Sequence, residues 1–135
     1  MNRILVDMSA TILHHGHVRL LAKASEHGKV IVALTSDSEI LLKKNYMPEL
    51  AFNERREILE SIKYVDEVIS SPWLIDDEFL DIHNIDFLVH GHDNKNQVAK
   101  EKLIIFPRTE GISSTKIRAS ILRALSEQII SSENS

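Results

Sequence analysis

The chain has 135 residues, of which 43% are hydrophobic, and its formal net charge at pH 7 is −4. This length is enough for one compact domain with a buried core and too short for two. The absence of cysteine excludes a disulfide framework and thiolate metal sites. The acidic balance argues against a nonspecific nucleic-acid binder, because such proteins generally carry a basic excess. We expect one domain over residues 1–130 and a frayed polar tail at 131–135.

The N-terminal residues 1–7 run directly into a short apolar segment with an acidic end, unlike a signal peptide with its longer apolar region. No stretch of the sequence is long and apolar enough to span a bilayer. The expected location is therefore the cytoplasm, with no membrane partner and no nucleic-acid partner.

Short β-branched runs alternate with amphipathic segments along the chain. Strands are expected at residues 4–6, 30–34, 65–69, 87–89 and 103–106, and helices at 16–28, 54–62 and 114–129. Gly28 would end the first helix in the left-handed conformation. Apolar runs without strict alternation are typical of parallel strands that helices cover on both faces. The sequence predicts an α/β fold, a Rossmann-like doubly wound five-stranded parallel sheet.

Histidines are concentrated in two segments that follow predicted strands in the sequence, residues 14–17 and 90–92. Ligands of open parallel sheets bind outside the carboxyl ends of the strands, where the strand order reverses, and strands one and four would flank that crevice. Gly16 lets the backbone approach a ligand, and the helix that starts there offers unpaired N–H groups to a phosphate. Imidazoles at His14 and His17 can donate hydrogen bonds to phosphate oxygens.

A third cluster lies at residues 108–118, where a glycine, three consecutive hydroxyls and several cations precede and begin the last predicted helix. Hydroxyls, cations and a helix start again suit a phosphate. The alternative is that Ser113 or Ser114 only caps the helix. Together with the histidine clusters, this segment favours a phosphate-bearing ligand.

These residues resemble a known superfamily. Residues 14–17, HHGH, are similar to the HxGH signature of nucleotidyltransferases, and residues 112–118, ISSTKIR, are similar to their second signature, ISSTxxR. Between them, residues 53–59 and 64–69 look like the corresponding helix and strand of glycerol-3-phosphate cytidylyltransferases. The resemblance implies an enzyme that joins CMP from CTP to a small phosphate or phosphonate and releases pyrophosphate.

The resemblance also implies roles by position. His14 and His17 would hold the CTP phosphates, Lys44 or alternatively Lys43 would reach the α-phosphate or the acceptor, and Arg55 would lie near the acceptor. Further nucleotide contacts would come from Ser9, Ala10, Gly16, Gly91, Asp93, Arg108, Thr109, Ile112, Ser113, Ser114 and Thr115. No protein ligand to a metal is assigned, because Mg²⁺ is expected to bind mainly through the CTP phosphates.

Two segments depart from the glycerol-3-phosphate enzymes. Residues 8–11, MSAT, stand where those enzymes carry a GTFD-like segment, and residues 93–94 lack the tryptophan that tends to follow there. Residues 6–17 instead resemble cytidylyltransferase domains found fused to, or beside, phosphoenolpyruvate mutases. We therefore expect a phosphonate acceptor such as 2-hydroxyethyl- or 2-aminoethylphosphonate, with glycerol 3-phosphate as the alternative.

Other interpretations stay open. An adenylyltransferase would share both signatures, because the base is selected by loops outside them, and a non-catalytic nucleotide-binding module would keep the fold. A zinc site could use His14, His17, His90 and His92. Asp7 could contact Mg²⁺ or cap its loop. A homodimer is the expected assembly.

Overall fold

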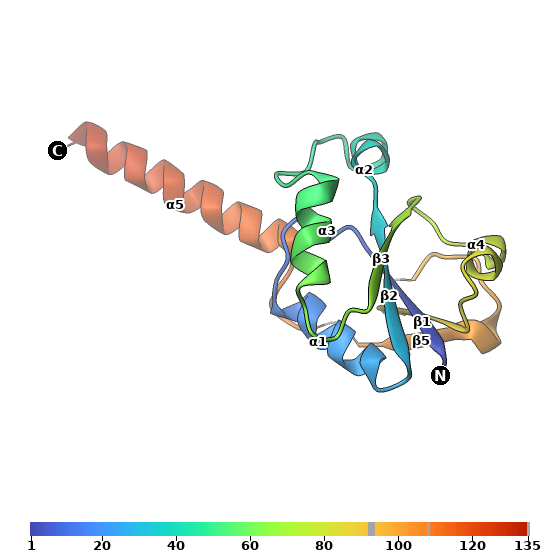
Figure 1. Ribbon diagram of the computed structural model, residues 1–135. Helices are drawn as coiled ribbons and strands as arrows, with labels where there is room; N and C mark the ends of the chain where they lie inside the picture. Colours follow the sequence, from blue (N-terminus) through green and yellow to red (C-terminus); the bar gives the residue numbers. More distant parts are fainter. Residues whose placement is uncertain (92–93, 108, 135) are drawn as a thin grey trace.

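The computed structural model describes residues 1–91, 94–107 and 109–134 (Figure 1). The described residues form one five-stranded sheet in the order β3-β2-β1-β4-β5, with parallel pairing throughout. The strands are β1 (Arg3–Met8), β2 (Lys29–Thr35), β3 (Glu67–Ser71), β4 (Phe87–Gly91) and β5 (Leu103–Phe106). The predicted Rossmann-like sheet is confirmed, and its strand order reverses between β1 and β4.

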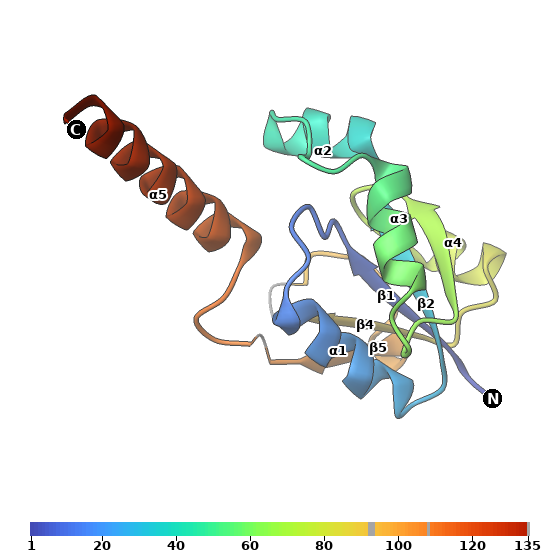
Figure 2. The same ribbon diagram turned by 60° about the vertical axis from the view of Figure 1, so that its left-hand side comes forward.

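Helices cover both faces of this sheet (Figure 2). They are α1 (His15–Ser25), α2 (Asp37–Lys44), α3 (Phe52–Glu60), α4 (Asp77–Ile82) and α5 (Ser114–Asn134), with a 3₁₀ turn at Lys100–Lys102. Neither α2 nor α4 is predicted from the sequence, because six to eight residues are too few to show a helical period. Their starts are fixed by side-chain caps, with Ser36 accepting from the Glu39 N–H and Asp76 from the Phe79 N–H.

Two buried clusters lie on the two faces of the sheet, because successive side chains of a strand point to opposite faces. Val6 of β1 joins Leu21 of α1 and Leu59 of α3 in one cluster, whereas Leu5 joins Leu80 of α4 in the other. In register, residue 5 of β1 lies opposite residue 31 of β2 and residue 88 of β4. The core therefore fixes β1 at the centre of the fold, with the ends of β1 and β4 side by side.

The last helix is longer than predicted. It runs to Asn134 instead of ending at residue 129, so residues 131–134 of the expected tail are helical. The sequence has no glycine or proline between Ser114 and Asn134 that would end a helix. Figure 1 shows α5 leaving the body of the domain. Among the described residues, no helix is long and apolar enough to cross a membrane.

The glycine after α1 does not serve as the predicted left-handed cap. The C-cap is Glu26 in the right-handed conformation, and Gly28 lies two residues further on with φ 157°. A Cβ at position 28 would lie 2.3 Å from the carbonyl oxygen of Asn2, which accepts the Lys29 N–H at 2.8 Å. Glycine is needed here because the backbone of Asn2, just before β1, passes too close to position 28 for a Cβ to fit.

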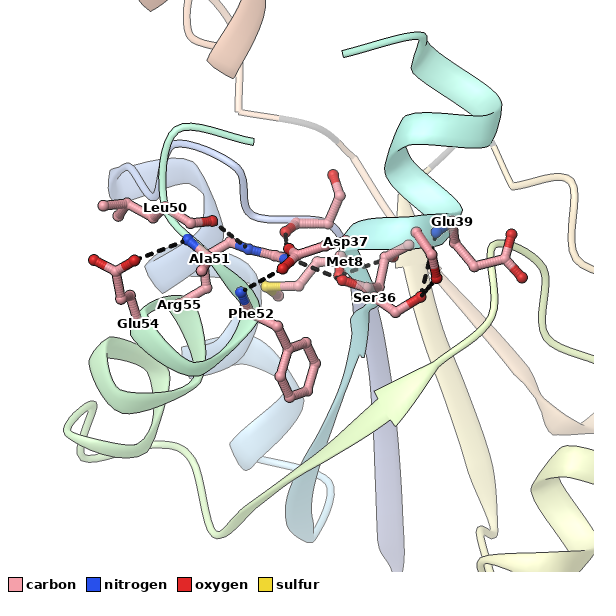
Figure 3. A network of polar contacts seen from close by, with 12 residues as sticks. Met8, Ser36, Asp37, Glu39, Leu50, Ala51, Phe52, Glu54 and Arg55 are labelled. Carbon is pink, nitrogen blue, oxygen red and sulfur yellow. Dashed lines mark hydrogen bonds and ion pairs between the residues drawn. The ribbon is translucent and has the colours of Figure 1, made fainter. Parts of the chain in front are cut away.

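Arg55 of α3 ties together the segments that follow β1 and β2, as Figure 3 shows. Its side chain is buried. Nη1 donates to the carbonyl oxygens of Ser9 at 2.6 Å and Thr35 at 3.0 Å, Nη2 donates to Asp37 at 2.6 Å, and Nε donates to the carbonyl oxygen of Leu50 at 3.1 Å. The guanidinium is thus satisfied by the protein itself, and it holds both strand ends in place.

Arg55→Ala is expected to lower the free energy of unfolding by about 3–5 kcal/mol, because it leaves Asp37 and two strand-end carbonyls without their partner. Arg56→Ala is the matched control, since the neighbouring arginine forms only an exposed pair with Glu60, worth no more than about 0.5 kcal/mol. Urea unfolding followed by circular dichroism measures both. Equal losses in the two variants would contradict the structural role of Arg55.

Candidate active site

A pocket of about 740 Å³ opens where the carboxyl ends of β1 and β4 meet the starts of α1 and α5. This is the position that the reversal of strand order predicts. The residues predicted from the sequence that line it are Ser9, His14, Gly16, His17, Lys44, Gly91, Thr109, Ile112, Ser113, Ser114 and Thr115. The fold therefore brings segments from opposite ends of the chain to one cavity.

Several predicted residues do not line this pocket. Arg55, predicted to lie near the acceptor, does not line the pocket, because its guanidinium is buried in the network between α3 and the strand ends. Ala10 is 3% exposed and has φ 45°, and its side chain belongs to the core. Lys44 lines the pocket and the alternative Lys43 does not. Asp93 and Arg108 lie outside the described residues.

His14 and His17 form a reciprocal cap at the start of α1. Nδ1 of His14 accepts the Gly16 N–H at 3.1 Å, and Nδ1 of His17 accepts the His14 N–H at 3.2 Å. This is a capping box in which imidazole nitrogens replace the usual oxygens. Because Nδ1 accepts in both rings, a neutral ring carries its proton on Nε2. Each ring is therefore set up as a donor at its outer nitrogen.

Glycine at position 16 has a structural role in addition to the predicted close approach of the backbone to a ligand. A Cβ at this position would lie 2.8 Å from Cε1 and 2.9 Å from Nδ1 of His14. Such distances are too short for a side-chain carbon, so any larger residue would push the His14 ring out of its cap. Glycine at position 16 is thus what allows His14 to fold over the helix start.

The two rings are also kept neutral. Burial, and to a smaller extent the nearby His14, lowers the pKa of His17 to about 4. Burial likewise lowers the pKa of His14, with a smaller effect from His15. The ring centroids of His14 and His17 are 4.0 Å apart, so two positive charges there would repel. Near neutral pH both rings are uncharged hydrogen-bond donors.

The start of α5 is held by its two serines in different ways. Ser113 Oγ accepts the Lys116 N–H at 3.1 Å, so Ser113 has the capping role that was one alternative for it. Ser114 Oγ donates to the carbonyl oxygen of Ile12 at 2.9 Å, which joins α5 to the loop after β1. Two helix N-termini, those of α1 and α5, consequently border the same pocket and favour an anion there.

A second tie joins α5 to the other side of the pocket. Arg118 donates from Nε and Nη2 to the two carboxylate oxygens of Glu49 at 2.6 Å and 2.7 Å, and its guanidinium lies 4.5 Å from the centroid of the Tyr46 ring. These bonds lower the pKa of Glu49. Tyr46 and Glu49 follow Lys44 at the end of α2, so this contact links Lys44 to the helix start that carries Ser114.

Sequence reasoning missed a polar network at the ends of β1 and β4. Asp7 Oδ1 lies 2.5 Å from His90 Nδ1, and Asp7 Oδ2 accepts from Asn96 Nδ2 at 3.0 Å. Both Asp7 oxygens are thus bonded to protein groups, which fits the loop-capping alternative for Asp7. The available signal was that Asp7 and His90 end the two strands flanking the crevice. Asn96 gave no such signal.

The pocket also has a cationic and an aromatic wall that the sequence did not indicate. Arg19, Lys23 and Lys95 line it together with Lys44. Lys44 Nζ lies 5.5 Å from the centroid of the Trp73 ring, which also lines the pocket. The four cations favour a ligand with several negative charges.

The zinc alternative receives no support. It needs His14, His17, His90 and His92, and His92 lies outside the described residues. Within the described part of the chain, no group of three or more histidine, aspartate or glutamate side chains is arranged to hold a metal ion.

Neutral His17 should make the fold less stable in acid. Its pKa is lowered in the folded chain, so it binds its proton only on unfolding, and the free energy of unfolding falls as the pH drops from 6.5 towards about 4. The slope from this group is at most about 1.4 kcal/mol per pH unit. His17→Asn keeps an acceptor near the Nδ1 position and does not titrate, so it should flatten the slope measured by urea unfolding. An unchanged slope would contradict a neutral His17.

Comparison with known proteins identifies the family of this chain. The model of the cytidylyltransferase-like family matches residues 9–120. The glycerol-3-phosphate cytidylyltransferase of Bacillus subtilis (strain 168) is 36% identical over 126 residues, which cover 90% of this chain and 98% of that protein. The glycerol-3-phosphate cytidylyltransferase of Staphylococcus aureus (strain NCTC 8325 / PS 47) is 38% identical over 126 residues, covering 87% and 93%.

More distant similarities agree with this picture. The ethanolamine-phosphate cytidylyltransferase of Arabidopsis thaliana is 32% identical over 149 residues, covering 98% of this chain and 35% of that protein. The crystal structure of the lipopolysaccharide core biosynthesis protein from Thermoplasma volcanium GSS1 matches with a TM-score of 0.68 at 20% identity, covering 82% of this chain and 99% of that one, which shows the shared fold. The chain therefore belongs to the cytidylyltransferase-like family of nucleotidyltransferases, as the signatures at residues 14–17 and 112–118 predict.

Proposed function

We propose that the chain transfers CMP from CTP to glycerol 3-phosphate and releases pyrophosphate. The observation that carries this proposal is the pocket itself, in which two helix N-termini, the neutral rings of His14 and His17 and the cation of Lys44 surround one cavity. The relatives named for glycerol 3-phosphate support the acceptor, because they match over nearly their whole length. The expected phosphonate acceptor has no such support among these relatives.

The charge of the pocket supports an acceptor without a cationic head group. Its described lining holds four cations and a single carboxylate, Asp7, whose oxygens are bonded to His90 and Asn96. The Trp73 ring, which could otherwise receive an ammonium group, lies under Lys44. An ethanolamine or choline group would therefore lack a partner among these residues, whereas the hydroxyls of glycerol need none with a charge.

A phosphonate ending in a hydroxyl is the second candidate. The segment that departs from the glycerol-3-phosphate enzymes, residues 8–11, reaches the pocket through Met8 and Ser9. The Ser9 carbonyl is fixed by Arg55, so this segment has a defined position beside the ligand. 2-Hydroxyethylphosphonate has the same combination of an anion and a hydroxyl, and 2-aminoethylphosphonate does not.

The reaction we propose is a direct displacement. An acceptor phosphate oxygen attacks the α-phosphorus of CTP, the bond from this phosphorus to the oxygen bridging to the β-phosphate breaks, and pyrophosphate leaves with that oxygen and its electron pair. His14 and His17 would donate from Nε2 to phosphate oxygens that gain charge, while Lys44 and the start of α5 hold the anions in line. No covalent intermediate with the protein is required.

Magnesium is part of the proposal as a companion of the nucleotide. Mg²⁺ prefers oxygen ligands and is commonly held by substrate phosphates with one or two carboxylates. Among the described residues no cluster suits a metal, and Asp7 has both oxygens engaged, so no protein ligand is assigned. When bound to the triphosphate, Mg²⁺ would reduce its negative charge.

We also propose that the chain acts as a homodimer, as the resemblance implies. This part of the proposal is separate from the reaction. A monomer with full cytidylyltransferase activity would remove the dimer from the proposal and leave the reaction standing.

Release of pyrophosphate from Mg²⁺-CTP is expected with glycerol 3-phosphate, and at least tenfold less with phosphocholine or phosphoethanolamine, because of the cationic lining. A coupled pyrophosphate assay measures this with 2-hydroxyethyl- and 2-aminoethylphosphonate in the same panel and ATP as the nucleotide control. Release with 2-hydroxyethylphosphonate alone would make this phosphonate the acceptor in place of glycerol 3-phosphate. Release only with ATP would overturn the assignment of CTP as the nucleotide. CTP binding without turnover on any acceptor would favour the non-catalytic module.

His17→Asn is expected to lower kcat at least about a hundredfold, because loss of one positioned donor to a developing anion costs about 3–4 kcal/mol. The asparagine keeps an acceptor for the His14 N–H, so the helix start should survive, as circular dichroism would show. His15→Asn is the matched control, since His15 is exposed and does not line the pocket. Near-normal turnover of the His17 variant would refute its role as a donor.

A further inference from the structure

Asn96 connects three segments of the pocket wall that lie far apart in the sequence. It follows β4, lines the pocket and is 8% exposed. Its Oδ1 accepts the N–H of Ile75, before α4, at 2.7 Å, and its Nδ2 donates to Oδ2 of Asp7, near the end of β1, at 3.0 Å. The same Nδ2 donates to Oδ1 of Asn94 at 2.9 Å. One side chain therefore holds these three segments together.

The partners of the Asn96 side chain explain why it is an amide. The Ile75 N–H requires an acceptor, whereas the Asp7 carboxylate and Oδ1 of Asn94 require donors. Asparagine offers a carbonyl oxygen and two N–H groups, and all of these are used. A carboxylate at position 96 would place a second oxygen against two acceptors, which leaves buried polar atoms without partners. The contacts therefore fix both the residue type and the orientation of its amide.

The segments that carry Ile75 and Asn96 run side by side next to the pocket. Asp76 and Gln97, one residue further along each segment, form a parallel bridge. The bond from Asn96 to the Ile75 N–H is buried. The residues just before this junction line the pocket, and they are Trp73, Leu74 and Lys95. A change at Asn96 would therefore move a wall of the pocket.

A chain of contacts leads from Asn96 to Lys44. The Trp73 ring, two residues before Ile75, lies 5.5 Å from Lys44 Nζ. The bonds of Asn96 itself go to Asp7, to Ile75 and within its own segment, and among the described residues none reaches the donors at the starts of α1 and α5. Asn96 therefore holds a side of the lining that includes Asp7, Trp73 and Lys44, separate from the donors proposed for the triphosphate.

We propose that Asn96 is a positioning residue for the acceptor, an inference that rests on the proposed reaction. In that reaction the triphosphate occupies the side of the pocket with the histidine donors and the start of α5, which leaves the side with Asp7, Trp73 and Lys44 to the acceptor. By holding Asp7 against residues 73–75, Asn96 sets the place of the acceptor relative to the α-phosphorus. Rate depends steeply on such placement, even when the residue that provides it does not touch the reacting atoms.

Asn96→Asp tests this role with almost no change in shape, because an oxygen replaces the amide nitrogen that faces Asp7. We expect kcat/KM for glycerol 3-phosphate to fall at least about tenfold, through misplacement of the acceptor. The Kd of CTP should remain that of the wild type, because the triphosphate donors keep their places.

Asn94→Asp is the matched control. It adds the same charge two residues away and keeps the Oδ1 that accepts from Asn96, so its kinetics should be those of the wild type. Equal losses of kcat/KM in the two variants would overturn the proposal, as would a weakening of CTP binding as large as the loss of kcat/KM in Asn96→Asp.

Fluorescence of the ligand-free chain gives a readout that does not depend on turnover. Trp73 is the only tryptophan of the sequence and is partly buried in the wall that Asn96 holds. Asn96→Asp should shift its emission to longer wavelength and increase its quenching by acrylamide, whereas Asn94→Asp should change neither. Unchanged Trp73 fluorescence in Asn96→Asp would overturn the role of Asn96. A wild-type chain without turnover would instead overturn the proposed reaction.

A paired exchange keeps the test open if Asn96→Asp alone does not fold, as circular dichroism would show. Asp7→Asn combined with Asn96→Asp again places an amide donor opposite a carboxylate. This double variant should recover Trp73 fluorescence and part of the lost kcat/KM. A folded double variant that recovers neither would contradict the positioning role.

Discussion

The reciprocal hydrogen bonds between His14 and His17 determine what the pocket can offer a phosphate. Each Nδ1 is used to start α1, so each ring has only Nε2 left as a donor. Burial keeps both rings neutral, so they offer direction without charge. The condition for all this is a glycine at position 16, because any Cβ there would collide with the His14 ring. One helix cap therefore serves folding and, in the proposed reaction, would also orient the donors.

The sequence predicted the sheet and most of the pocket because those signals are local. Apolar runs identify the strands, and the segments at residues 14–17 and 112–118 carry their own helix starts. Arg55 could not be placed in the same way. Its partners Ser9 and Thr35 are 46 and 20 residues away, and only the assembled sheet brings their carbonyls together around one guanidinium. A buried arginine and an acceptor-binding arginine look alike in a sequence.

The other differences between the predicted and the observed elements come from short helices, from one close backbone contact and from a missing helix-end signal. The helices α2 and α4 are set by single capping side chains and by their fit to the sheet, and neither is long enough to show a period. Gly28 looks like a helix cap in the sequence, but glycine is required there because the carbonyl group of Asn2 leaves no room for a Cβ. The sequence near residue 130 contains no residue that ends a helix. A tail is predicted there from polar composition alone, and α5 continues to Asn134.

The lining of the pocket combines cationic side chains with neutral hydrogen-bond donors. In the proposed reaction, the lysines and the arginine of the lining would act over several ångströms and attract two anionic substrates, which would otherwise repel each other in one cavity. The neutral imidazoles would add little to that attraction, yet their bonds would strengthen as charge builds on the phosphate oxygens, so they would favour the transition state over the bound substrates. Such selectivity works only if the donors do not move. The ties through Arg55, Ser114 and Arg118 would therefore contribute to the rate by holding the donors of the pocket in place.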